Sequence, residues 1–182
     1  MPRTLMVLVL LSMSMLRPLD AAGGSLDRKL VTEIAGIHVG VDSEKRVVSR
    51  YGIGSVVKNE GHLDGRYYTD SNHMLTLHVV TGVDYIIEDV ELIRGKHVPE
   101  HFQGDIEISD ELRLPISIQH GINLGMTRVE VTTILGDPDN VKVTAKGIML
   151  SYSTSVDEDK RVQVNYDATY EFENDRLIRV SI

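Results

Sequence analysis

Residues Gly121–Asn140, GINLGMTRVEVTTILGDPDN, contain a short helix together with the residues that begin and end it. Thr127 and Glu130 have the spacing of a capping box, in which each side chain bonds a backbone N–H of the first turn. Met126 and Val131 have the spacing of a hydrophobic staple, which fixes how the chain enters a helix. The stretch therefore predicts a helix whose first turn follows Thr127.

One face of this predicted helix is apolar, and its end is marked as clearly as its start. Val131, Ile134 and Leu135 recur at the spacing that gathers side chains on one side of a helix. Gly136 can take the left-handed conformation that closes many helices, and Pro138 prevents continuation. The helix must therefore pack its apolar side on another element.

The opening of this stretch has a counterpart earlier in the chain. Gly36–Asp42 and Gly121–Thr127 share the pattern Gly-Ile-x-(Val/Leu)-Gly-apolar-(Asp/Thr), and 121 − 36 gives a spacing of 85 residues. Asp42 is expected to be the N-cap of an earlier helix that ends at Gly52. Lys45 cannot close a capping box there, so this helix should be the weaker one. The long period indicates a domain duplication rather than a solenoid.

Strand patterns follow each predicted helix. The clearest is Val162–Glu173, where apolar and polar residues alternate throughout, as in a half-buried strand. Asn174 and Asp175 form a turn into a returning strand, and Ser155–Arg161 is expected to be a charged loop. The other predicted strands are Ser55–Lys58, Gly65–Thr69, His73–Val80, Tyr85–Ile93 and Gly147–Ser153.

These elements predict an α+β protein of two tandem units, each a short helix packed on an antiparallel β-sheet. The units span residues 30–93 and 116–182. Residues 94–115 contain two prolines and two glycines and have a mixed charge, so they are expected to be a linker or an extended connection lying on the second unit.

The first residues have the pattern of a secretory signal peptide, assigned to residues 1–22. Arg3 precedes a short apolar run, and small residues follow it where a signal peptidase could cut. The run is shorter than the roughly 20 residues of a membrane span. A periplasmic or secreted location is expected, with no membrane anchor after cleavage; an uncleaved anchor is the alternative. The chain has no cysteine for a disulfide or a lipid.

The residues of the opening stretch also resemble a known family. The run from Gly121 to Pro138, with its capping box and helix-ending glycine, is similar to the SmpA/OmlA-like proteins, the small outer-membrane-assembly lipoprotein fold. The tandem arrangement resembles the secreted β-lactamase inhibitor proteins, which are built from two such units. The resemblance implies cell-envelope modules that bind other proteins without chemistry. The lipoproteins' anchoring cysteine is absent, and no inhibitor contact residue can be matched here.

Residues that suggest chemistry have simpler interpretations. His97 and His101 have the spacing of a helical zinc pair, but Pro99 lies between them, so solvated histidines are expected. The glycines of Gly52–Gly54 end a helix instead of opening a phosphate loop. The acidic run Asp157–Asp159 lacks the spacing of a calcium loop. We therefore expect no catalytic residue, no metal, no cofactor and no enzyme activity.

The favoured hypothesis is an exported, non-catalytic protein-binding module of the inhibitor or assembly-factor kind. A small-molecule-binding module is the alternative, and a hydrolase or a metal-dependent enzyme comes after it. A net charge of −8 argues against nucleic acid. The expected partner is another protein with a basic surface, which an acidic sheet face would attract. The polar side of the predicted sheet is the candidate binding face. Its candidate residues are Asn165, Asp167, Thr169, Glu171, Thr76 and His78.

Overall fold

The computed structural model of the chain describes residues 31–57, 65–97, 102, 104–159 and 162–182. It is an α+β protein with a mostly antiparallel sheet and two α-helices among these residues. The predicted signal peptide lies outside the described residues. None of the helices in the described part is long and apolar enough to cross a membrane.

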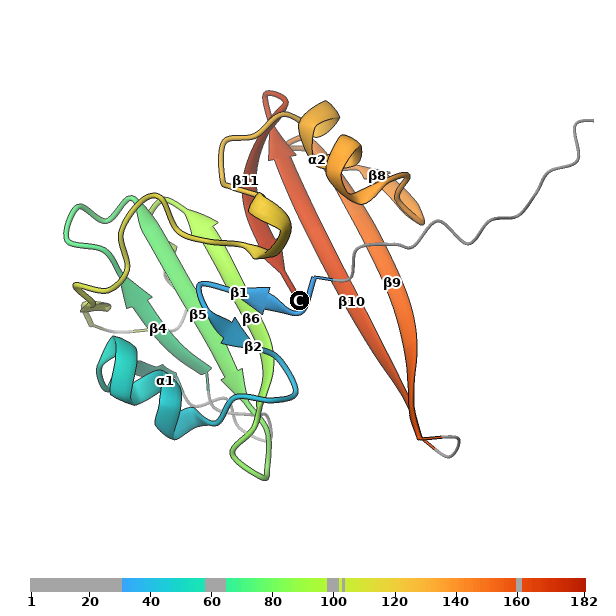
Figure 1. The fold of residues 1–182 in the computed structure, drawn as a ribbon. Helices are drawn as coiled ribbons and strands as arrows, with labels where there is room; N and C mark the ends of the chain where they lie inside the picture. The colour runs from blue at the N-terminus through green and yellow to red at the C-terminus, as the bar shows by residue number, and fades with distance from the viewer. Residues whose placement is uncertain (1–30, 58–64, 98–101, 103, 160–161) are drawn as a thin grey trace, which may run out of the picture.

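The main sheet consists of two antiparallel meanders that meet edge to edge (Figure 1). The first contains β3 to β6 and the second β8 to β11, in the order β3-β4-β5-β6-β11-β10-β9-β8. β6 and β11, the last strand of each meander, pair through Ile93 with Arg179, Leu92 with Val180 and Glu91 with Ser181. The strands along this path are β3 (Ser55–Val57), β4 (Gly65–Thr69), β5 (Leu75–Thr81), β6 (Ile87–Arg94), β8 (Asn140–Val143), β9 (Ile148–Asp159), β10 (Val162–Glu173) and β11 (Arg176–Ser181).

Helix α2 (Arg128–Leu135) confirms the prediction from the opening stretch. Thr127 is its N-cap, and the capping box with Glu130 is complete. The helix ends at Gly136, whose φ of 86° suits a residue without a Cβ. Val131 is fully buried, as its place on the apolar face requires. Since every cue lies within a few residues, the local sequence was sufficient to define this helix.

Helix α1 (Glu44–Tyr51) ends at Gly52 as expected, but its predicted N-cap was wrong by one residue. Ser43 is the N-cap and makes no side-chain capping bond. Asp42 is buried instead, where its carboxylate accepts a bond from the backbone N–H of His38 and pairs with Arg46. The carboxylate thus joins the loop before the helix to the Arg46 side chain instead of acting as the N-cap.

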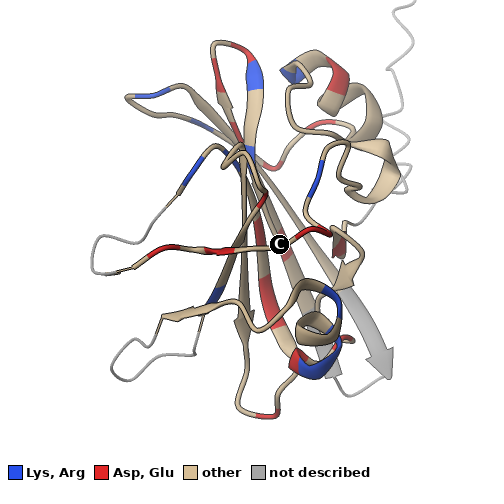
Figure 2. Cartoon of the chain, turned by 90° about the vertical axis from the view of Figure 1, so that its left-hand side faces the viewer, with Lys and Arg blue, Asp and Glu red and all other residues tan. Residues whose placement is uncertain are grey.

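Both helices cover the same side of the sheet (Figure 2). The buried residues form one hydrophobic cluster that continues across the β6–β11 junction through Leu92 and Val180. Tyr51 and Tyr68 pack together in the first half, and Tyr152 and Tyr170 meet edge to face in the second. The other side of the sheet carries no described helix, and we call it the open face.

Several elements differ from the expectations. The predicted loop Ser155–Arg161 was wrong over most of its length, because β9 continues to Asp159 and its acidic residues pair with the start of β10. The sequence patterns also missed β8, the small hairpin of β1 (Glu33–Ile34) with β2 (Ile37–His38), β7 (Glu107–Ile108) and a 3-10 turn at Gln119–Gly121.

The connection between the halves is attached to the first half, not the second. β7 pairs in parallel with β4, and Ile106 and Leu112 on either side of it are buried. The predicted position on the second unit was therefore wrong for this described part of the connection.

Candidate functional site

The open face brings together most of the residues proposed from the sequence. β10 places Asn165, Asp167, Thr169 and Glu171 on it, because their neighbours Ala168, Tyr170 and Phe172 point into the core. Asn165 and Asp167 are exposed, whereas Thr169 and Glu171 are half-buried. The alternation of apolar and polar residues in β10 was therefore sufficient to predict which of its residues face away from the core.

Hydroxyl groups of the neighbouring strands orient these polar side chains. Ser153 Oγ donates to Asp167 Oδ1 at 2.6 Å, and Ser155 Oγ lies 2.7 Å from Asn165 Oδ1. Thr169 Oγ1 lies 2.9 Å from the hydroxyl oxygen of Ser181. A row of hydroxyls and amides with preset directions is suited to hydrogen bonding with a partner, since less rotamer freedom is lost on binding.

Thr76 does not belong to an accessible face. It occupies an open-face position on β5 but is fully buried. Its hydroxyl donates to Gly95 O at 2.8 Å and accepts from the backbone N–H of His97 at 2.9 Å. The chain after β6 therefore covers it, which alternation within a single strand could not reveal.

His78 lies in a polar cluster at the junction of the two halves. Its ring stacks on Tyr67, with centroids 4.1 Å apart, and its Nδ1 lies 3.6 Å from Glu91 Oε2. Arg179 Nε donates to Glu91 Oε1 at 2.5 Å, and a second guanidinium nitrogen contacts the same oxygen. Arg179 also lies 3.7 Å from Glu171. Glu91 thus links β5, β6 and β11 across the junction.

The carboxyl groups of this cluster have opposite pKa shifts. Burial acts to raise the pKa of Glu91, but the contact with His78 and the charge of Arg179 together outweigh it, so that this pKa is lowered. The pKa of Asp89, next along the open face of β6, is raised by burial and by the charge of Glu91. Glu91 is therefore the carboxylate that the junction stabilises, while Asp89 has no hydrogen bond or ion pair among the described residues.

Negative charge predominates in the centre of the open face. Asp89, Glu91, Asp167 and Glu171 share it with Arg179. Four residues of this face were not predicted from the sequence: Tyr67, Asp89, Glu91 and Arg179. A signal did exist for Glu91 and Arg179, since each is a charged residue flanked by apolar residues within a predicted strand, but their partners could not be identified from sequence.

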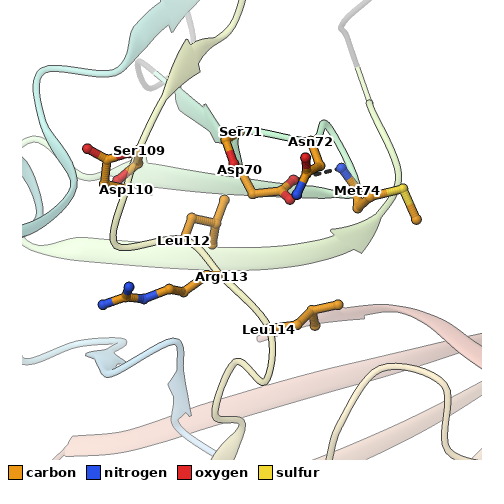
Figure 3. A pocket seen from close by; sticks show the side chains of 9 residues that line it. All are labelled: Asp70, Ser71, Asn72, Met74, Ser109, Asp110, Leu112, Arg113 and Leu114. Carbon is orange, nitrogen blue, oxygen red and sulfur yellow. Dashed lines mark hydrogen bonds between the residues drawn. The ribbon is translucent and has the colours of Figure 1, made fainter.

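Hollows outside this face give weaker support for a small-molecule site. The one in Figure 3, of about 470 Å³, is lined by Asp70, Asp110 and Arg113 among others. Asp70 is used structurally, because its carboxylate accepts bonds from the backbone N–H groups of Met74 and Leu75, each at 2.7 Å. The remaining polar groups, apart from buried Ser109, are on exposed residues, so few converge on a ligand.

The described residues hold no cluster suited to a metal ion. No group of at least three His, Asp or Glu side chains in them could hold an ion. His97 is exposed at the end of the described segment, and His101 lies outside the described residues, as does Pro99.

Comparison with models of protein families, with curated proteins and with solved structures found no match to this chain.

Proposed function

We propose that this chain is an exported, non-catalytic protein-binding module of the cell envelope, and that the open face is its docking surface. The observation that carries the proposal is the continuous, polar and acidic open face, which crosses from one half of the molecule to the other. Such a surface attracts a partner with a basic surface and accelerates its association.

We further infer that the two halves are tandem related units, as the repeated Gly-Ile pattern suggests. Each half has one short helix followed by an antiparallel four-strand meander, and the halves meet through their last strands. This correspondence supports the likeness to the SmpA/OmlA-like fold and to the tandem arrangement of secreted β-lactamase inhibitor proteins. Those proteins bind other proteins, so the likeness favours binding over chemistry.

Export is tested on protein from the native cell. Intact-mass measurement should find a mature chain beginning near Gly23–Ser25, because the small residues there follow the apolar run. Retention of Met1 on cytosolic protein would contradict the envelope location.

The docking surface is tested by capture from an envelope extract with three forms of the mature protein. Wild type should retain a partner that the double variant Asp167→Lys/Glu171→Lys loses. The matched control is Glu111→Lys/Asp137→Lys, which makes the same change in charge at two exposed positions off the open face. The control should still capture the partner.

Two results would refute the proposal. Equal capture by the open-face variant, with the fold shown intact by circular dichroism, would place the interface elsewhere. Loss of the partner in both double variants would show that net charge matters and the open face does not.

A further inference from the structure

Among the described residues, β10 has an edge without a strand partner inside the sheet, beyond the point where β11 ends. β10 pairs with β9 over its whole length, but with β11 only over Thr169–Glu173. Among the described residues, the edge of β10 before Thr169 has no strand partner on the β11 side. A hollow of about 370 Å³ lies beside it, lined by residues of three segments: Val39, Gly40, Asp84, Ile86, Ile87, Glu88, Asn165 and Tyr166.

The register identifies which backbone groups point to this edge. Ile182 exchanges two hydrogen bonds with Val90 of β6, so its backbone groups point toward β6. In an antiparallel ladder the direction alternates from residue to residue, so the backbone of Ser181 points to its partner Thr169 on β10. Because the same alternation continues along β10, the backbone N–H and C=O groups of Asp167 and Asn165 point outward from the unpaired edge.

The two sides of this edge differ in chemistry. On the helix side, Tyr166 lies beside Val39 and Gly40, and its hydroxyl is 3.6 Å from the position that a Cβ on Gly40 would take, so Tyr166 bounds a mainly apolar floor. On the open face, Asn165 and Asp167 are exposed, and Asp84 and Glu88 add two exposed carboxylates to the rim of the hollow. An added strand would therefore need small apolar side chains on one side and basic side chains on the other.

We propose that β10 takes up an extended segment of another polypeptide as an additional strand along Asn165–Asp167. The segment has basic residues opposite Asn165 and Asp167 and small apolar residues between them. Backbone pairing supplies the affinity and the alternation supplies the selectivity, as in other cases of strand addition to a sheet edge. This site is distinct from the junction cluster of Glu91 and Arg179 and does not depend on it.

The probe for the test is the labelled peptide acetyl-Val-Lys-Val-Lys-Val-Lys-amide, titrated by fluorescence anisotropy. In the proposed register the lysine N–H groups face β10, and the valine N–H groups face away from it. N-methylation of the lysines should therefore weaken binding at least about tenfold, whereas N-methylation of the valines, the matched control, should have a much smaller effect. A Val-Glu peptide should bind weakly.

Hydrogen exchange places the bound peptide on the protein. The amides of Asn165 and Asp167 should exchange quickly in the free protein and become protected with the peptide. Asp167→Pro should abolish binding, because it removes an N–H that β9 does not use, whereas Asp167→Ala should retain backbone pairing.

Three outcomes would overturn the proposal. Equal affinity of the two N-methylated peptides would show that the peptide binds through charge alone and not through backbone pairing. Slow exchange of Asn165 and Asp167 in the free protein would mean that the edge is already occupied by the chain itself. Absence of binding by every peptide would leave the edge without this function, while the open-face proposal would stand or fall by its own variants.

Discussion

Replacing Glu91 with glutamine tests whether the polar cluster holds the two halves together. The variant keeps the size of the side chain but removes the negative charge between His78 and Arg179. The Glu91 side chain is 10% exposed and receives two guanidinium contacts. Hydrogen bonds to charged groups contribute about 1.5–3 kcal/mol each. Since Arg179 stays partly in water, we expect a loss of about 2 kcal/mol in the free energy of unfolding.

Urea denaturation at pH 7 is the assay. With a slope of about 2 kcal/mol per molar, a loss of that size lowers the midpoint by about 1 M. The matched control is Glu171→Gln, because Glu171 is 37% exposed and its carboxylate is 3.7 Å from the same guanidinium. An exposed pair of this kind contributes less than about 1 kcal/mol, so the control should barely move the midpoint.

The effect should depend on pH in a defined direction. Because the pKa of Glu91 is lowered below 4.5 in the folded protein, its ionised form stabilises the fold at neutral pH, and this contribution is lost as the pH falls through the folded pKa. The difference between wild type and Glu91→Gln should therefore narrow in acid. Equal midpoints at pH 7, or a difference that grows in acid, would refute the assigned role of Glu91.

Three further substitutions test local parts of the fold. Thr127→Ala should cost about 1 kcal/mol, whereas Ser43→Ala should cost much less because Ser43 makes no side-chain capping bond; equal losses in urea denaturation would contradict the assigned caps. Tyr170→Phe should leave stability unchanged or raise it by about 1 kcal/mol, since the buried Tyr170 hydroxyl has no hydrogen-bond partner among the described residues; a clear fall in the thermal midpoint would indicate a partner for that hydroxyl.

The sequence predicted the features that depend on near neighbours. The α2 caps lie within a few residues of each other, and the alternation of β10 gives the side on which each residue lies. Ser43 is the N-cap instead of Asp42 because the Asp42 carboxylate bonds His38 and Arg46. The N-cap preference of a residue type does not show that other groups will bond its side chain.

The features that the sequence could not supply depend on distant partners. The acidic end of β9 has the composition of a loop, and only its pairing with β10 shows that it is a strand. The contact between Glu91 and Arg179 joins residues 88 positions apart, and Thr76 is covered by a segment 19 to 21 positions away. These contacts determine which part of the open face is accessible, so the candidate site could be outlined from sequence but not completed.

The most direct test of the docking surface is the association rate of the captured partner with the immobilised mature protein at two salt concentrations. If the acidic open face docks the partner, the rate constant should fall as salt rises from about 50 to 300 mM, because screening weakens the attraction between charges. Asp167→Lys/Glu171→Lys should lower the low-salt rate constant at least about tenfold. A rate constant that is insensitive to salt and equal in the variant would contradict the account.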